Sequence, residues 1–211
     1  MEIPNWLSGK LDSKGADEIS AAVGRAEKHT SAEIVPMVVR GSITVGHVPW
    51  LLFFIAIPLT WVLLPLVLHN WVGEILTVVV ASVFAFVFKR FATVQRILTP
   101  DEDEMASVQR RALLEFHLAN LPSTEKATGV LIFVSMLERR AVILADAAIT
   151  ARFDADAWDR VLKALLAEIG KGNFAGGMQE AIALVGSMLA EKFPAPTHGV
   201  NELPNTLIIK D

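Results

Sequence analysis

Three aspartates, Asp146, Asp154 and Asp156, are the residues whose type and spacing best suit chemistry in this sequence. Asp146 follows an apolar run with strand composition, and ligands often bind beyond the ends of strands in open α/β sheets. Carboxylate oxygens are the ligands that Ca²⁺ and Mg²⁺ prefer, and three carboxylates that repel one another are relieved by a cation. We therefore predict a metal site, completed by backbone carbonyls and water, with weak affinity for Ca²⁺ or Mg²⁺.

The same aspartates also have a structural interpretation. Asp154 and Asp156 come just before or within the start of a helical pattern, where an aspartate caps the first turn. The segment starting at Asp154 also departs from a calcium-binding EF-hand loop. Trp158 stands where that loop needs its third side-chain ligand, and Asp159 stands where it needs glycine. Helix capping is thus the alternative to metal binding.

Patterns of the common catalytic sites are absent from the sequence. It has no cysteine, which excludes disulfides, thiolate catalysis and cysteine-ligated metals. No histidine has a second histidine four residues away, and neither G-x-S-x-G nor G-x-x-x-x-G-K-[ST] occurs. The glycine-rich stretch 170–177 joins two predicted helices instead of following a strand, so it is predicted to be a turn and not a phosphate-binding loop.

Two classes of function follow from this inventory. Phosphoryl transfer needs charge neutralisation, here by a metal or by Arg139, Arg140 and Arg152. Yet no serine or histidine is evidently placed as a nucleophile beside a base. We therefore predict a non-catalytic accessory or modulator module of a membrane complex. The alternative is a metal-dependent phosphatase that uses the three aspartates of the acidic loop.

The apolar residues are concentrated in one region of the chain. They make up 53% of the sequence, against roughly 45–50% in soluble domains, and the mean hydropathy is +0.46. The run 48–68 has no charged residue and would span about 31 Å as a helix, close to the thickness of a bilayer core. A second run, 72–88, follows it. These runs predict a transmembrane helical hairpin over 48–88, because helices of a soluble core are shorter and amphipathic.

Charged residues around the hairpin predict its orientation. Arg40 precedes it, Lys89, Arg90 and Arg96 follow it, and the link between the runs has no basic residue. Because basic flanks stay on the cytoplasmic side, both termini are predicted to be cytoplasmic and the protein to reside in a bacterial inner membrane. The net charge of −4 gives nucleic acid no general attraction, so no nucleic-acid partner is expected.

Small residues recur every fourth position in the second run: Gly73, Thr77, Ala81 and Ala85. This spacing lets two membrane helices approach closely. We expect a seam against the first run or, alternatively, a homo-oligomer. The other expected partners are the lipid bilayer and a membrane protein that the sequence does not identify.

The remainder of the chain contains the patterns of one α/β domain. Residues 1–47 hold a helix followed by a strand at 31–39, in which Pro36 favours an edge position or a bulge. Residues 89–194 hold a helix with a capping box at Thr99, antiparallel strands at 129–137 and 141–145, and helices at 156–169 and 176–193. Residues 195–211 form a C-terminal arm. The order predicts a sheet layered with helices and interrupted by the hairpin.

Four segments of the chain resemble the TPM domain family. They are HTSAEIVPMVV, TGVLIFVSMLERRAVILAD, the helix start AWDRV and GGMQEAIALVGSMLAEKFP, and the resemblance runs from about Gly15 to Pro194. It is greatest to the small bacterial membrane version, in which a helical hairpin interrupts the domain after its first strand. The resemblance implies a Rossmann-like sandwich, a short mixed sheet flanked by helices. Its plant members are linked to phosphatase activity and photosystem repair, its animal members to receptor modulation, and some members bind calcium through acidic loop residues.

Overall fold

The computed structural model describes residues 3–42, 100–119, 121, 128–195 and 203–211, together with helical residues 54, 58, 75–76, 78–80 and 82–83. The chain divides into two compact units. One joins Met1–Ser42 with Val108–Asp211, and the other is Ile43–Ser107.

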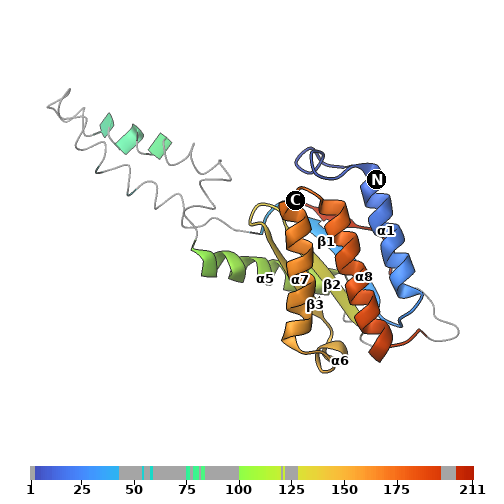
Figure 1. Cartoon of the computed structure of the whole chain (residues 1–211). Coiled ribbons are helices and arrows are strands. Elements are labelled where there is room, and N and C mark those ends of the chain that lie inside the picture. The colour runs from blue at the N-terminus through green and yellow to red at the C-terminus, as the bar shows by residue number, and fades with distance from the viewer. Residues whose placement is uncertain are drawn as a thin grey trace. The chain divides into compact units, whose positions relative to one another are not determined.

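The first unit is built on a four-stranded sheet of order β3-β2-β1-β4 (Figure 1). The central strand β1 (Glu33–Val39) pairs in parallel with β2 (Gly129–Ser135) on one side and with β4 (Ile208–Lys210) on the other. Strand β3 (Arg140–Ala145) runs antiparallel to β2. The carboxyl ends of β1, β2 and β4 therefore meet at one edge of the sheet, which we call the carboxyl edge.

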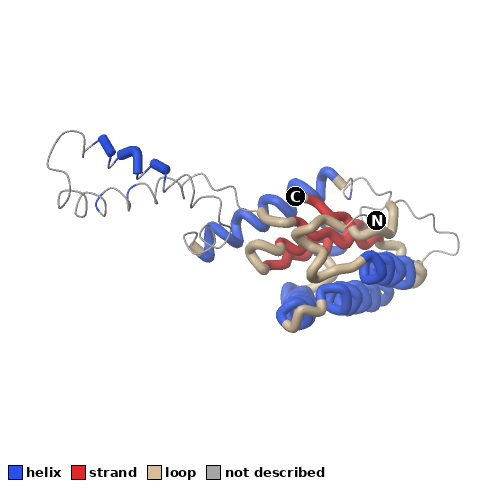
Figure 2. Tube along the Cα trace, turned by 90° about the horizontal axis from the view of Figure 1, so that it is seen from above, coloured by secondary structure: helices blue, strands red, loops and turns tan. Residues whose placement is uncertain are grey.

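Helices cover both faces of this sheet. On one face lie α1 (Ser13–Glu27), α8 (Phe174–Lys192) and α7 (Ala155–Gly170), with α8 packed between the other two. Figure 2 shows these three helices on one side of the sheet and α5 (Asp101–Leu118) on the other. The short helix α6 (Ala147–Thr150) connects β3 to α7. The fold is thus an α/β sandwich around a mixed sheet, as the sequence predicts.

The core explains why β1 and β2 read as unbroken apolar runs. Every residue of both strands is buried. Because side chains alternate along a strand, Ile34, Val38 and Ile132 join the core beneath α1, α7 and α8, while Met37 and Phe133 are buried on the other face. Burying one such side chain contributes about 1.5–3 kcal/mol.

Most of the predicted elements are confirmed, including the antiparallel pair formed by β2 and β3. Pro36 differs from the expectation, because it lies in the central strand opposite Ile132 of β2. The proline is tolerated because β4 pairs with β1 only from Met37 onward, so Pro36 has no partner on that side in β4. The C-terminal arm also contains a strand, β4, that the sequence analysis did not predict.

The turn between α7 and α8 shows one further difference. The predicted helix ends at residue 169, but Gly170 is the last residue of α7, and Lys171 occupies the C-cap. The left-handed conformation falls two residues later, at Gly172, whose φ is 85°. A glycine there reverses the chain at little steric cost. Asn173 then caps α8 by accepting the backbone N–H of Gly176 at 3.1 Å. Only residues 171–173 of the glycine-rich stretch form the predicted turn, because Gly170 ends α7 and α8 begins at Phe174.

The predicted transmembrane hairpin lies mostly outside the described residues. Among the residues that the structure does describe, no helix is both long and apolar enough to cross a bilayer. Thr99 of the capping box and the small residues Gly73, Thr77, Ala81 and Ala85 also lie outside the described part of the chain. The hairpin and its packing seam stay predictions.

Candidate functional site

The two ends of the sheet carry different polar groups. The predicted metal ligand Asp146 lies at the end opposite the carboxyl edge, because β3 runs antiparallel and finishes beside the first residue of β2. Oδ2 of Asp146 accepts the backbone N–H of Gly129 at 2.9 Å, and the N–H of Asp146 donates to the carbonyl oxygen of Gly129 at 3.0 Å. Asp146 is 8% exposed. Its carboxylate thus extends the ladder between β2 and β3, at the amino ends of β1 and β2.

Asp154 and Asp156 lie nearby in sequence at the start of α7. Asp154 occupies the N-cap position but makes no side-chain cap hydrogen bond, and Asp156 is in the first turn. Both are exposed. Within the described ranges, no three His, Cys, Asp or Glu side chains are grouped so that they could hold a metal ion. The structure therefore does not bring the three aspartates together as a preformed site, and cation binding stays a prediction.

The arginines expected to assist phosphoryl transfer are divided between the two ends of the sheet. Arg139 and Arg140 lie in the turn and at the start of β3, at the carboxyl edge, whereas Asp146 follows the last residue of β3. A strand of this length separates them by about 20 Å. Arg152 is at the same end as Asp146, but its guanidinium lies over the ring of Phe193, 5.8 Å from the centroid. The predicted acids and two of the three predicted arginines cannot act on one phosphate.

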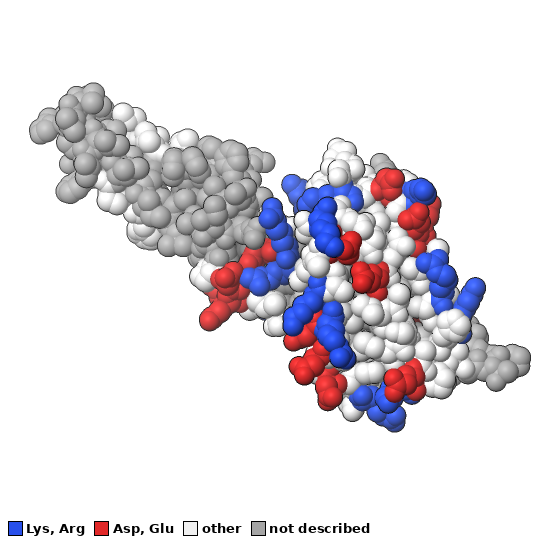
Figure 3. Space-filling view, viewed as in Figure 1, with Lys and Arg blue, Asp and Glu red and all other residues white. Residues whose placement is uncertain are grey.

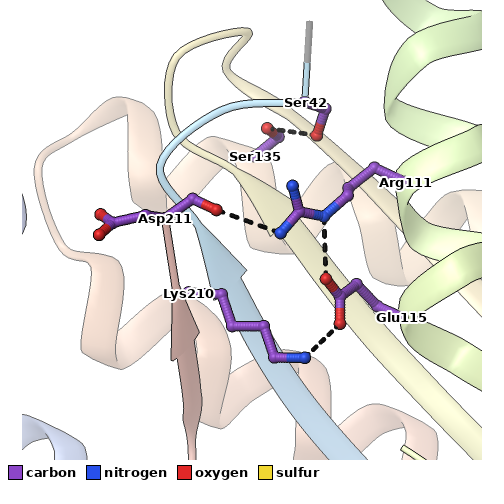
Figure 4. A network of polar contacts seen from close by, with 6 residues as sticks. All are labelled: Ser42, Arg111, Glu115, Ser135, Lys210 and Asp211. Atoms are coloured by element: carbon purple, nitrogen blue, oxygen red, sulfur yellow. Dashed lines mark hydrogen bonds and ion pairs between the residues drawn. The ribbon is translucent and has the colours of Figure 1, made fainter. Parts of the chain in front are cut away.

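The carboxyl edge holds a buried polar cluster of Ser42, Ser135 and Glu138, part of which is drawn in Figure 4. The hydroxyls of Ser42 and Ser135 are 2.8 Å apart. Ser135 Oγ donates to Oε2 of Glu138, and the backbone N–H of Ser42 donates to Oε1 at 2.9 Å. Three segments supply the cluster: the segment that follows β1, the last residue of β2, and the turn that leads to β3.

A serine beside a carboxylate resembles a nucleophile beside its base, but the burial of this cluster argues for another role. Ser135 is 0% exposed and Glu138 is 1% exposed, so a substrate in solution does not reach them. The cluster instead fixes the ends of β1 and β2 relative to each other. Buried hydrogen bonds to a carboxylate suit this structural role. If the strand ends separated, a desolvated polar group would lose its partner, which is costly.

A second network links α5 to the end of β4 (Figure 4). Glu115 of α5 is 2% exposed and lies between two cations. Its Oε1 accepts the Nε–H of Arg111 at 2.9 Å, and its Oε2 accepts from Nζ of Lys210 at 2.5 Å. Arg111 also donates to the carbonyl oxygen of Asp211 at 3.1 Å. The short strand β4 is thus held by ion pairs as well as by its pairing with β1.

One carboxyl of the domain has a strongly altered acidity. The pKa of Glu27 is raised to about 7, chiefly by burial, and the charge of neighbouring Glu33 contributes to the rise. Hydrogen bonds from the backbone of Ile34 and from Asn205 act in the opposite direction. Glu27 ends α1, so this group joins α1, the start of β1 and the C-terminal segment.

Sequence reasoning missed both networks of the carboxyl edge. Glu138 and Arg139, which has a φ of 55°, lie in the turn between β2 and β3, but the role of Glu138 in that turn was not predicted. The signal available was a serine that ends an apolar strand and a glutamate three residues later. This signal does not identify the donor Ser42 unless the neighbouring strand is known, because Ser42 is 96 residues distant from Glu138 in the chain.

Comparisons with known proteins agree with this architecture. The family model of the TPM domain matches residues 90–188. The NMR structure of BA42 protein from the psychrophilic bacterium Bizionia argentinensis is similar over 94% of this chain and 94% of its own, with a TM-score of 0.61 and 23% identity. At that identity the likeness shows the fold alone. No curated protein matches the chain.

The match of the TPM domain model begins after β1, although β1 is the central strand of the sheet. Residues 90–188 are thus similar to the TPM domain, and β1, which precedes them in the chain, completes the sheet of the first unit.

Proposed function

We propose that this protein is an integral membrane protein whose TPM domain acts on the cytoplasmic side as a non-catalytic accessory or modulator module of a membrane complex. The observation that carries the proposal is the exposure of apolar side chains in the second unit. Between residues 75 and 83, every residue that the structure describes is helical and exposed. The large apolar side chains among them, from 41% to 57% exposed, are Ile75, Leu76, Val78, Val79, Val80 and Val83.

Such exposure favours an apolar surrounding. Contiguous apolar surface of this kind marks a protein or membrane contact. The polar residue of the same stretch, Ser82, donates its hydroxyl to the carbonyl oxygen of Val78 at 2.7 Å, one helical turn back. This bond satisfies the hydroxyl without water, as a lipid-facing helix demands. The stretch lies inside the second predicted span.

The polar clusters of the domain support the non-catalytic part of the proposal. Ser135 and Glu138 are buried and engaged with each other, and Glu115 is engaged with Arg111 and Lys210. These groups stabilise strand ends and are not presented to a substrate. The expected partner is a membrane protein, together with the lipid bilayer.

Fractionation and reporter fusions test the proposal. The full chain should remain in the membrane pellet after carbonate extraction at high pH. Reporters fused after Asp211 should be active in the cytoplasm, and reporters at Asn70 should be active on the other side. Release by carbonate, or a C-terminal reporter active outside the cytoplasm, would overturn the location. Capture of a membrane protein in mild detergent tests the accessory role.

A metal-dependent phosphatase is the second candidate, and one observation favours it. Asp154 stands at the N-cap position of α7 without a cap hydrogen bond from its side chain, so the competing structural use is not made. Purified full chain would then be stabilised by Ca²⁺ or Mg²⁺, by about 1.4 kcal/mol at ten times the dissociation constant. It would also hydrolyse a generic phosphate ester with the metal present.

The variants for this second test are chosen so that the fold survives. Asp154→Asn and Asp156→Asn change exposed residues, whereas Asp146→Ala would remove the buried acceptor of Gly129. The matched control is Asp159→Asn, another exposed aspartate of α7. If ~50 mM Ca²⁺ gives no melting shift at matched ionic strength, and phosphate-ester turnover is absent, the phosphatase candidate is excluded.

A further inference from the structure

Basic side chains form a row along the carboxyl edge of the sheet. Lys210 ends β4, Arg40 directly follows β1, Arg139 ends the turn after β2, and Arg140 begins β3. Backbone hydrogen bonds set their order. The N–H of Arg40 donates to the carbonyl oxygen of Lys210 at 3.0 Å, and the carbonyl oxygen of Arg40 accepts from Leu137 of the turn at 2.9 Å. With neighbouring strands about 4.8 Å apart, this basic row is about 15 Å long.

Three acidic residues at the same edge accept hydrogen bonds or form ion pairs. Glu138 is buried and accepts from Ser42 and Ser135, and Glu115 is buried between Arg111 and Lys210. The exposed carboxylate of Asp211 accepts the indole N–H of Trp6 at 2.8 Å. Arg40 and Arg139 are both exposed. This edge therefore presents two exposed arginines to solvent.

Arg139 is an unusual residue for its place in the turn. Its φ of 55° lies in the left-handed region, where glycine or asparagine costs less than a long side chain. A basic residue retained in a strained turn conformation suggests a use for its side chain. By contrast, acidic and basic side chains are interspersed over the helical face drawn in Figure 3.

The carboxyl edge is also where the chain leaves β1 for the predicted hairpin. Five residues, 43–47, separate Ser42 from the start of the predicted first span at 48. A fully extended chain of that length reaches at most about 20 Å. If the first predicted span lies in the bilayer, the carboxyl edge lies no farther than about 20 Å from the lipid headgroups.

We propose that the basic row, Arg40, Arg139, Arg140 and Lys210, is a docking surface for the headgroups of anionic phospholipids in the leaflet that the hairpin enters. This inference rests on the proposed membrane anchoring. The short segment 43–47 keeps the basic row near the membrane surface. The positive charge of the row then orients the domain with its carboxyl edge toward the leaflet. The attraction acts within a Debye length of about 8 Å at physiological salt, so it requires close approach.

Hydrogen exchange of the full chain in nanodiscs tests the docking. Two disc compositions are compared, phosphatidylcholine alone and phosphatidylcholine with 30% phosphatidylglycerol. We expect amides of the turn 136–140 to exchange at least threefold more slowly in the anionic discs, and 0.5 M NaCl to abolish the difference. A third arm adds 10 mM inorganic phosphate to the uncharged discs, and no protection is expected there.

The variants remove charge without disturbing the fold. Arg40→Gln combined with Arg139→Gly should abolish the lipid-dependent protection, and the glycine also suits the positive φ. The matched control neutralises two exposed basic residues at the other end of the sheet, Arg25→Gln with Lys28→Gln. This control should keep the protection of the parent chain.

The outcomes separate this inference from the proposed function. Equal exchange in both discs, or protection that survives Arg40→Gln with Arg139→Gly, overturns the docking surface while leaving the anchoring intact. Protection by inorganic phosphate in uncharged discs also overturns it and assigns the row to a soluble anion. Failure of the chain to remain in discs or in carbonate-washed membranes overturns the anchoring itself.

Discussion

Oε1 of Glu138 accepts the backbone N–H of Ser42 at 2.9 Å, across 96 residues of sequence. The turn between β2 and β3 thereby holds the residue at which the chain leaves the sheet. Oε2 of the same carboxylate accepts from Ser135 at the end of β2. One buried side chain thus closes the domain around the point where the insertion begins, and the two halves of the domain meet there.

Replacing Glu138 should destabilise the domain. Glu138→Ala leaves the buried N–H of Ser42 and the hydroxyl of Ser135 without this acceptor, at a cost of about 1–3 kcal/mol. Glu138→Gln keeps the shape and one carbonyl oxygen, so it should recover part of the loss. Thermal melting of purified full chain measures both, with the exposed Asp17→Ala as the control. A melting temperature equal to the parent's for Glu138→Ala would show that the cluster contributes nothing.

Glu27 should make stability depend on pH between about 4.5 and 7. Burial raises the pKa of Glu27 from 4.5 to about 7 in the folded domain. The neutral carboxyl is therefore the form that suits the fold. Its advantage is complete below the unfolded pKa and is lost as the pH rises through 7.

The substitution Glu27→Gln removes this titration. The glutamine variant should be more stable than the parent at pH 8, by roughly 1–2 kcal/mol after allowance for partial exposure of the side chain. The difference should shrink on acidification and vanish near pH 4. Urea titrations at several pH values give the comparison. A constant difference between the two proteins from pH 4 to 8 would contradict the altered pKa.

Periodicity and apolar runs were sufficient to predict the main elements of the domain. Strand β2 reads as a continuous apolar run because both of its faces are covered, and α7 shows Val161 and Leu165 on one buried stripe. Local signals fail for β4, which has three residues. Its strand conformation comes from pairing with β1 and from Lys210 bound to Glu115, contacts that local sequence does not encode.

Local sequence also fails to predict which residues gather at the candidate site. Asp146 was correctly placed after a strand, but whether a strand end carries ligands depends on its direction relative to the others. Since β3 runs antiparallel, Asp146 lies at the amino ends of β1 and β2. The polar residues that do gather at the carboxyl edge come from positions 42, 111, 115, 135, 138 and 210. Only the strand order brings them together.

Removing Glu115 should loosen β4 more than the rest of the sheet. Glu115→Ala leaves Arg111 and Lys210 without the buried carboxylate that joins them. Loss of about 1.4 kcal/mol would speed amide exchange in Ile208–Lys210 about tenfold if those amides exchange by local opening. The control is Glu191→Ala, which breaks an exposed pair with Lys192 and should change exchange little. Unchanged exchange in β4 would indicate that strand pairing alone holds it.

The contact of α1 with α8 should be the most sensitive helical contact in the domain to added volume. A methyl group at Gly186 of α8 would lie 2.6 Å from Cβ of Ala26 and 3.3 Å from its Cα, so two helix backbones would have to move apart. Overpacking of this kind costs about 1–3 kcal/mol, which outweighs the gain of up to about 1 kcal/mol in helix propensity. Gly186→Ala should therefore lower the melting temperature.

The matched control is Gly170→Ala, at the end of α7, where nothing lies within 4 Å of the added methyl. That variant should melt at or above the parent temperature. If both alanines raised the melting temperature alike, α1 and α8 would have room to separate, and the close approach at Gly186 would not limit the stability of the domain.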